Sequence, residues 1–338
     1  MISLDGPSCQ RALGELLISR YGLAVDSVEG FALGGSGYTY VARTRTMRYF
    51  VKLHNPDGSQ DLDFTLRVAR TLNGTWRIEG VLPPLAALSG TLYVLLGPCP
   101  ISVHPFIQGR NAATREPLTE SETIRIGMLV GEFHRSAAAL EFMGGPTERF
   151  DTECIEILDG LLIGKSGPGG IVGSVLDLLA RNREALHDAM AVLKRLQDRA
   201  RAAPFRYAIT HGDLTLHNFM VDEDERFHVI DWDSALLAPV ERDLIFFGET
   251  GFEPFLCGYA RTTALEHVNI DLLSFFAYRW CLDGIAFFAN RLLAEDVTSD
   301  RTQTDLAVLQ TFLPFDAKRI ANTISSMERI IRKLSPRA

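Results

Sequence analysis

The 338-residue chain lacks the features that define several classes of protein. Its five cysteines are widely spaced and include no Cys-x-x-Cys pair, which argues against a disulfide framework or a zinc site and favours free thiols in a reducing compartment. Basic residues are not in excess. The net charge is -8, so a nucleic-acid partner is not expected, and a cationic small molecule suits the chain better. Repeats, low-complexity tracts and heptads, which would indicate a scaffold, are also missing.

Signals for membrane insertion are weak. The N-terminus has no basic region followed by an apolar run, so no secretory signal is evident. The most apolar long stretch, residues 272–293, contains Arg279, Asp283 and Arg291, which would be costly in a bilayer. We therefore predict a buried core helix there, no membrane partner and a cytoplasmic location.

The predicted elements change in kind along the chain. Strand-like runs fall early, and helical periodicity dominates after about residue 110. The predicted strands are 28–33, 38–44, 48–54, 92–96 and 101–107. The predicted helices are 7–20, 61–72, 119–142, 171–200, 272–293 and 320–334. This order predicts an α+β architecture, a small β-rich part followed by a large helical part, with the active site in the cleft.

The densest chemistry lies between residues 209 and 247. A short apolar run leads to His211 and Asp213 at a turn, and Asn218 follows five positions after Asp213. A second strand-like run ends at Asp231, and an acidic turn joins the two runs as a hairpin. Two carboxylates and one amide are thereby predicted on neighbouring loop tips.

Phosphoryl transfer from a nucleotide to an alcohol needs this set of groups. The protein must place metal ions on the phosphates and orient the acceptor hydroxyl. Asp213 suits the role of the base that takes the hydroxyl proton, and Asn218 and Asp231 offer the hard oxygen ligands that Mg²⁺ prefers. The catalytic loop of protein kinases has the same Asp-to-Asn spacing and a metal-binding Asp downstream. The plainer alternative is a hairpin whose polar residues only cap its turns.

These motifs, HGDLTLHN at 211–218 and IDWD at 230–233, resemble those of the aminoglycoside phosphotransferase and choline kinase superfamily. The continuation LAPVERDL at 237–244 resembles the spectinomycin phosphotransferase branch. The resemblance implies a bilobal protein-kinase-like fold that uses ATP and Mg²⁺. It also implies an N-terminal nucleotide-binding lobe at 1–107 and a helical catalytic and substrate-binding lobe at 108–338.

Lys52 and a glycine-rich turn are the candidate phosphate contacts in the first lobe. The turn contains Gly35, Ser36 and Gly37, where backbone amides can approach phosphate oxygens, although such a turn also occurs in ordinary hairpins. Lys52 lies in an alternating strand that directs it to the face opposite its apolar neighbours, where the bland alternative is a surface lysine.

The resemblance implies further roles. Lys52 would grip the α and β phosphates and be held by an acidic residue of the next helix, with Asp63 the preferred partner and Asp61 the alternative. Backbone groups at His104, Phe106 and Ile107 would meet the adenine edge. His211 would brace the catalytic loop, and Asp243 would tie the loop to the following helix.

Three other polar positions are candidates for a functional or an interior role. Asp283 follows Arg279 by four residues on a predicted helix, so it forms either an intrahelical ion pair or, as the resemblance of residues 278–286 suggests, a contact with a substrate ammonium. Glu249 is a second candidate for the acceptor side, although acidic residues are also common on solvated loops. His134 is interpreted as a satisfied interior histidine.

The predicted function is ATP-dependent O-phosphotransfer to a hydroxyl of an aminocyclitol or aminoglycoside antibiotic, with spectinomycin favoured and antibiotic resistance as the result. The alternative is a kinase of a small metabolic alcohol such as choline, homoserine or a thiosugar. The expected partner is a cationic small molecule, and the protein is expected to be a monomer or a homodimer.

Overall fold

The structure is a computed structural model of the chain. It describes residues 6–31, 38–56, 61–115, 117–135, 142, 144–163, 169–248, 251–265, 268–294 and 299–335. The chain divides into two compact units. The first unit comprises Met1–Pro146, Ala208–Leu237 and Gly258–Thr263, and the second comprises Thr147–Tyr207, Ala238–Cys257 and Ala264–Ala338. The boundary expected between residues 107 and 108, which would separate the nucleotide-binding lobe from the catalytic and substrate-binding lobe, stays a prediction.

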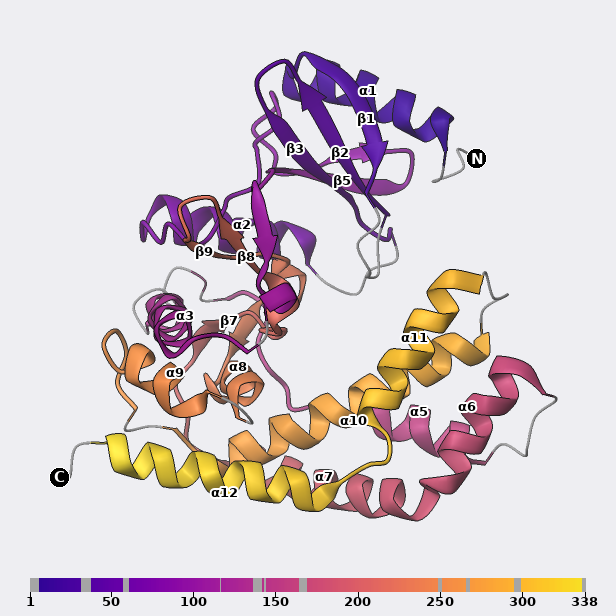
Figure 1. The fold of residues 1–338 in the computed structure, drawn as a ribbon, viewed down its shortest axis with the longest axis vertical. Helices are drawn as coiled ribbons and strands as arrows, with labels where there is room; N and C mark the ends of the chain where they lie inside the picture. The colour runs from indigo at the N-terminus through magenta and orange to yellow at the C-terminus, as the bar shows by residue number, and fades with distance from the viewer. Residues whose placement is uncertain are drawn as a thin grey trace. The chain divides into compact units, whose positions relative to one another are not determined.

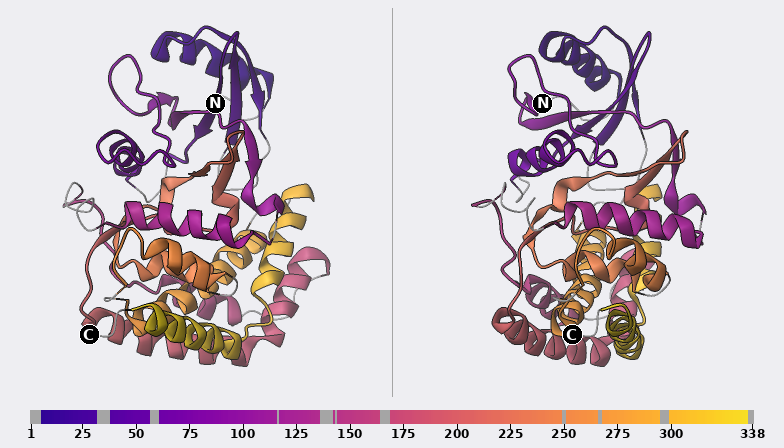
Figure 2. Two further views of the ribbon diagram at one scale, coloured as in Figure 1. Left: turned by 60° about the vertical axis from the view of Figure 1, so that its left-hand side comes forward. Right: turned by 90° about the vertical axis from the view of Figure 1, so that its left-hand side faces the viewer.

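The first unit contains an antiparallel five-stranded sheet with the strand order β1-β2-β3-β5-β4, seen at the top of Figure 1. Its strands are β1 (Val25–Gly30), β2 (Tyr38–Thr44), β3 (Arg48–Leu53), β4 (Val94–Leu96) and β5 (Cys99–Pro105). Helix α1 (Pro7–Tyr21) packs on one face of this sheet, as the two views of Figure 2 show. The helix ends as its sequence predicts, because Gly22 adopts the left-handed conformation (φ 68°) and its N–H bonds the carbonyl of Ile18.

The two faces of the sheet carry different side chains. Val51 and Leu53 of β3 and Val103 of β5 are buried in the core beneath α1. Because side chains alternate along a strand, Lys52 and its cross-strand partner Ser102 lie on the opposite face. This placement confirms that Lys52 points away from its apolar neighbours in the strand.

The rest of the first unit surrounds two short sheets. Helix α2 (Leu62–Gly74) and helix α3 (Glu120–Phe133) belong here, and α3 begins at the predicted capping box of Thr119 and Glu122. The small sheets are β6-β8-β9 and β10-β7. Their strands are β6 (Gly109–Asn111), β7 (Ala208–Thr210), β8 (Phe219–Asp222), β9 (Phe227–Val229) and β10 (Leu236–Ala238).

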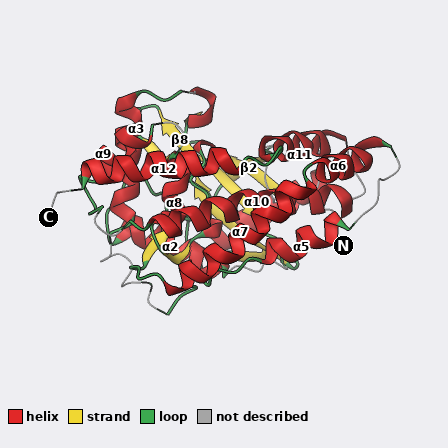
Figure 3. Cartoon of the chain, turned by 90° about the horizontal axis from the view of Figure 1, so that it is seen from below, coloured by secondary structure: helices red, strands yellow, loops and turns green. Residues whose placement is uncertain are grey.

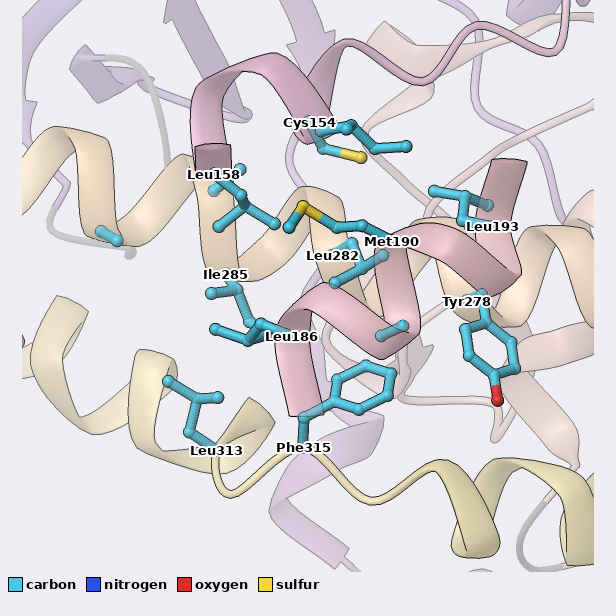
Figure 4. Close-up of a cluster of buried hydrophobic side chains, with 14 of the residues drawn as sticks. Cys154, Leu158, Leu186, Met190, Leu193, Tyr278, Leu282, Ile285, Leu313 and Phe315 are labelled. Atoms are coloured by element: carbon cyan, nitrogen blue, oxygen red, sulfur yellow. The ribbon is translucent and has the colours of Figure 1, made fainter. Parts of the chain in front are cut away.

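The second unit is helical. Figure 3 shows the predominance of helices. They are α5 (Glu153–Leu162), α6 (Gly170–Arg181), α7 (Arg183–Ala202), α8 (Glu241–Leu244), α9 (Phe252–Tyr259, whose last two residues belong to the first unit), α10 (Ile270–Ala294), α11 (Ser299–Phe312) and α12 (Ala317–Leu334). Their shared core is apolar, and Figure 4 shows Leu186 and Met190 of α7 meeting Leu282 and Ile285 of α10. Burying each such side chain stabilises the fold by about 1.5–3 kcal/mol.

Two predicted helices differ from the structure. The region 171–200 is two helices, because the chain breaks at Asn182, whose side-chain amide donates to the carbonyl of Leu178. The helix expected to reach residue 142 ends at Phe133. His134 follows it and is buried against the hydroxyl of Tyr259 at 3.0 Å, which confirms the interior role predicted for this histidine.

In the described part of the chain, α10 alone is long and apolar enough to cross a membrane by length and composition. Half of its most apolar window is buried inside the protein, where it packs on α5, α7, α11 and α12. A buried core helix passes the same test of length and composition, so this helix is weak evidence for a membrane span.

Candidate active site

Two neighbouring loops of the first unit carry the catalytic candidates. The buried strand β7 leads directly to His211, and Gly212 then takes a positive φ of 84° that turns the chain toward Asp213. The predicted hairpin forms as β8 and β9, with the carboxylate of Asp222 accepting backbone N–H groups across its turn. Strand β9 then leads to Asp231 on the second loop.

Hydrogen bonds tie the two loops together. His211 receives the N–H of Asp213 on Nδ1 at 3.2 Å, so its Nε2 carries the proton that it donates to the carbonyl of Ile230 at 2.9 Å. The N–H of Ile230 in turn donates to the carbonyl of Asn218 at 2.9 Å. His211 therefore braces the loops, as predicted, and one residue beyond Ile230 the chain reaches Asp231.

Asp213 is held on one oxygen only. The side-chain amide of Asn218 donates to its Oδ2 at 2.8 Å and to its carbonyl at 2.7 Å. The other carboxylate oxygen, Oδ1, is buried and has no hydrogen-bond partner among the described residues. Burial raises the pKa of the Asp213 carboxyl, and the charge of Asp231 raises it further, against the opposing effects of His211 and Asn218. A carboxylate with a spare oxygen and a raised pKa is suited to accept a proton.

Asp231 has a strained backbone and a shared carboxylate. It adopts the left-handed conformation (φ 63°, ψ 62°), which is uncommon for a residue other than glycine and often marks a functional position. Its side chain is 45% exposed, and its Oδ1 lies 2.6 Å from Nζ of Lys52. The predicted metal holder therefore lies directly beside the predicted phosphate contact.

Lys52 has a second carboxylate partner, Asp233, whose Oδ2 lies 2.8 Å from Nζ. Burial alone would lower the pKa of the Lys52 ammonium, but the two carboxylates outweigh it and raise the pKa above its usual range. For Asp233, burial acts to raise the pKa, yet His54 and Lys52 lower it well below its usual range. Lys52 is thus charged and held between the carboxylates of Asp231 and Asp233.

The expected pairing of Lys52 with α2 does not form in the structure. The carboxylate of Asp63 pairs instead with Arg67, one helical turn later, at 2.8 Å. Asp61, the alternative, accepts the N–H of Phe64 at 3.0 Å and caps the start of the helix. Both are engaged locally because short aspartate side chains at a helix start reach their own first turn most easily.

The remaining predicted positions fall in several places. Gly35, Ser36, Gly37 and Glu249 lie outside the described residues. His104 lies on β5 two residues after Ser102, with its Nε2 3.0 Å from the serine hydroxyl, and burial lowers the pKa of the His104 ring to about 4. The adenine contact of its backbone, and those of Phe106 and Ile107, stay predictions.

Asp283 lies in the second unit on α10. Its carboxylate is 3.9 Å from Nε of Arg279, a weak version of the predicted intrahelical pair, because Arg279 is bonded bidentately to Glu148 at 2.7 and 2.8 Å. Asp283 also lines a groove of about 430 Å³ with Glu153 and Phe287. The structure therefore shows the intrahelical ion pair of Arg279 and Asp283, one of the two predicted alternatives. The Asp283 carboxylate is half-exposed, and its contact with a substrate ammonium stays a prediction.

Phe31, Phe50 and His54 were not predicted as site residues. The ring of Phe31 meets those of Phe50 and Phe106 edge to face, with centroids 6.0 and 6.1 Å apart, and Phe50 lies on the same face of the sheet as Lys52. His54 shares that face and bonds Ser102. The alternation along β3 places Phe50 and His54 on the face of Lys52, whereas the contacts of Phe31 with Phe50 and Phe106 depend on how separate strands pair, which the sequence did not predict.

The side chains of Asn218 and Asp231 carry oxygen atoms of the kind that bind a magnesium ion. Because the amide nitrogen of Asn218 is used by Asp213, its oxygen is the atom left for a ligand, and Asp231 supplies a carboxylate. Mg²⁺ is commonly held by one or two such protein ligands together with phosphate oxygens and water. No group of three or more His, Cys, Asp and Glu side chains able to hold a metal occurs in the described ranges.

A model of the phosphotransferase enzyme family matches residues 27–267. The chain belongs to this family. Protein StrN of Streptomyces griseus is 28% identical over 222 residues, a match that spans 62% of this chain and 64% of the StrN protein. The match spans less than two thirds of the length of StrN, so StrN alone does not establish an activity.

Solved structures of other proteins share the fold. A spectinomycin phosphotransferase in complex with ADP and spectinomycin matches with a TM-score of 0.77 at 22% identity, over 95% of this chain and 98% of that one. A choline kinase from Streptococcus pneumoniae matches with a TM-score of 0.58 at 17% identity, over 95% of this chain and all of that one (100%). The α+β protein-kinase-like fold predicted from the sequence is thereby confirmed.

Proposed function

We propose that this phosphotransferase moves the γ-phosphoryl group of ATP to a hydroxyl of an aminocyclitol or aminoglycoside, with spectinomycin the favoured acceptor. The observation that carries the proposal is the state of Asp213. Its Oδ1 is buried and unpartnered among the described residues, and its other oxygen is fixed by Asn218. An acceptor hydroxyl is the natural partner for that oxygen, because it brings both a hydrogen bond and a proton to remove.

In the proposed reaction the acceptor oxygen forms a bond to the γ-phosphorus while the bond from that phosphorus to the β–γ bridging oxygen breaks, releasing ADP. Asp213 takes the proton of the hydroxyl. Lys52 neutralises charge on the α and β phosphates. Mg²⁺, bound by Asn218 and Asp231, would neutralise phosphate charge during transfer.

The acceptor class is supported by charge and by similarity. The chain carries a net charge of -8, which favours a cationic substrate. The solved relative with a TM-score of 0.77 holds ADP and spectinomycin, and this is the basis for naming spectinomycin first. We assign Asp283 to a substrate ammonium, because its carboxylate stays half-exposed in a groove with Glu153 and Phe287. A product that no longer binds its target would give resistance in the cytoplasm.

The second candidate is a kinase of a small metabolic alcohol, favoured by the similarity to a choline kinase with a TM-score of 0.58. Both candidates use the same base and metal ligands, so only the acceptor separates them. An acidic substrate side suits choline as well, since choline is also a cation.

An acceptor panel tests the proposal. The purified protein is incubated with MgATP and spectinomycin, streptomycin, other aminocyclitols, choline or homoserine, and ADP release is measured together with the mass of the product. We expect phosphorylated spectinomycin or a related aminocyclitol, and none from an Asp213→Asn control. Turnover of choline with every aminocyclitol ignored would establish the second candidate instead.

A further inference from the structure

Lys52 has two carboxylate partners that differ in what surrounds them. Asp231 is the more exposed, at 45%, and is one of the two groups suited to magnesium. Asp233 is 35% exposed and faces the ring of His54, with Nδ1 of the histidine 3.7 Å from its Oδ2. A metal ion bound to the carboxylate of Asp231 would weaken the ion pair between Asp231 and Lys52. Asp233 is not one of the two groups assigned to the metal, so its ion pair with Lys52 would remain.

Asp233 is backed by a hydrogen-bonded row on the sheet. Nε2 of His54 lies 2.8 Å from the hydroxyl of Ser102, and that hydroxyl lies 3.0 Å from Nε2 of His104. Ser102 is fully buried and pairs with Lys52 across β3 and β5. If Ser102 donates to His54 and accepts from His104, the remaining ring proton of His54 points at Asp233. The row therefore fixes His54 beside the carboxylate.

The carboxylates that would otherwise hold Lys52 are committed elsewhere. Asp63 pairs with Arg67, and Asp61 caps α2. Lysine in this position must keep one fixed acidic partner, because a free four-carbon side chain loses conformational entropy each time it meets a phosphate.

We propose that Asp233, supported by His54 and Ser102, is the carboxylate that positions Lys52 for the nucleotide, in the place usually taken by an acidic residue of the following helix. The inference rests on the nucleotide binding that the proposed function includes. It does not depend on which acceptor is phosphorylated. Asp233 is a positioning residue: it acts on phosphate through Lys52. Ser102 and His54 act one step further out.

Nucleotide affinity tests this assignment directly. Binding of MgADP, measured by calorimetry, is compared in wild type, Asp233→Asn and Ser102→Ala, with Glu29→Gln as a surface control in the same unit. Loss of one charge-assisted contact predicts a Kd about 10-fold higher for Asp233→Asn, and loss of a neutral hydrogen bond about 3-fold higher for Ser102→Ala. Glu29 lies on β1, where its exposed carboxylate pairs with Arg43, so its variant should bind as wild type does.

A double-mutant cycle separates positioning from a general loss of structure. In a Lys52→Met background, Asp233→Asn should add less than about 2-fold to the Kd, because the residue it positions is gone. Circular dichroism and the Tm report whether each variant folds. A variant that unfolds is replaced by Asp233→Ser in the same cycle.

Three results would overturn the assignment. Asp233→Asn could bind MgADP as tightly as wild type. Asp63→Asn could weaken binding as much as Asp233→Asn, which would mean that the α2 carboxylate takes Lys52 when nucleotide binds. Asp233→Asn could change only the Mg²⁺ concentration needed for binding, which would make Asp233 a metal ligand. Because acceptor is absent from these measurements, a protein that binds MgADP but phosphorylates no aminocyclitol would refute the acceptor proposal and leave this one standing.

Discussion

The first and second units each contain a group of charged side chains in close contact, and the two groups are balanced differently. In the second unit Glu148 accepts two hydrogen bonds from Arg279 and lies 3.8 Å from Arg242, while Asp283 lies 3.9 Å from Arg279. Two cations there face two carboxylates. In the first unit the single ammonium of Lys52 faces Asp231 and Asp233, with Asp213 close enough to Asp231 to feel its charge.

The difference separates a group that holds the fold from a group that awaits a ligand. The pKa of Glu148 is lowered overall, because bonds to Arg279 outweigh the effect of burial, whereas burial leaves the pKa of Asp213 raised. An excess of negative charge is costly without a cation, and magnesium would supply one. Neutralising a carboxylate should therefore have opposite effects on stability in the two places.

The largest effect is expected at Asp213. Asp213→Asn should lower turnover by about 10³-fold, because a positioned base contributes on the order of 10²–10⁴. The same change removes a buried charge with one unpaired oxygen, so the Tm should rise by about 1–3 °C. Steady-state kinetics and a thermal melt of one preparation give both numbers. Retention of turnover within tenfold of wild type would remove Asp213 from the role of base.

The opposite sign is expected at Glu148. Glu148→Gln leaves Arg279 buried without its charged partner, and breaking such a pair costs about 3–5 kcal/mol. Urea unfolding should show this loss. The double variant Glu148→Gln/Arg279→Met should regain part of it, since it also removes the guanidinium that has lost its bidentate partner. Equal stability of wild type and Glu148→Gln would erase the contrast between the two groups.

A pH-dependent effect is expected at Glu241 of α8. Burial raises the pKa of its carboxyl to about 7, although the N–H of Asn269 donates to it at 2.6 Å. Because the folded state then holds a proton that the unfolded state releases near its ordinary pKa, the stability from this group is present at low pH and is lost as the pH rises through about 7. Glu241→Gln should match wild type near pH 4 and exceed it at pH 8 by on the order of 2 kcal/mol. Parallel stability curves across this range would contradict the prediction.

The smallest effect is expected at the surface pair of Lys333 and Glu253, whose charged atoms are 2.5 Å apart. Exposed pairs contribute little, so Lys333→Ala should shift the Tm by no more than about 1 °C and leave turnover unchanged. A larger loss of turnover would indicate that Glu253, released from Lys333, acts on the acceptor side.

Much of the site could be predicted because its parts are local. The hairpin of β8 and β9, the turn before Asp213 and the outward face of Lys52 follow from short patterns of apolar and turn residues. The resemblance to the family motif added the role expected of each loop tip. Neither the local patterns nor the motif depends on contacts between residues far apart in the sequence.

The partners of Lys52 could not be predicted in the same way. The choice between Asp63 and Asp233 depends on which carboxylate is free, and Asp63 is taken by Arg67 within its own helix. The row from His54 through Ser102 to His104 depends on the register of β3 against β5, which brings together residues 48 positions apart. The sequence pattern over residues 171–200 is helical throughout, so the break at Asn182 could not be predicted from it.

The clamp on Lys52 has a use in chemical labelling. Lysine occurs in this sequence only at positions 52, 165, 194, 318 and 333. An ammonium held between Asp231 and Asp233 is a poor nucleophile, so electrophilic reagents that modify amines should spare Lys52 while the clamp is closed. With so few competing amines, peptide mapping after brief acylation would report the opening of the clamp from a single fragment.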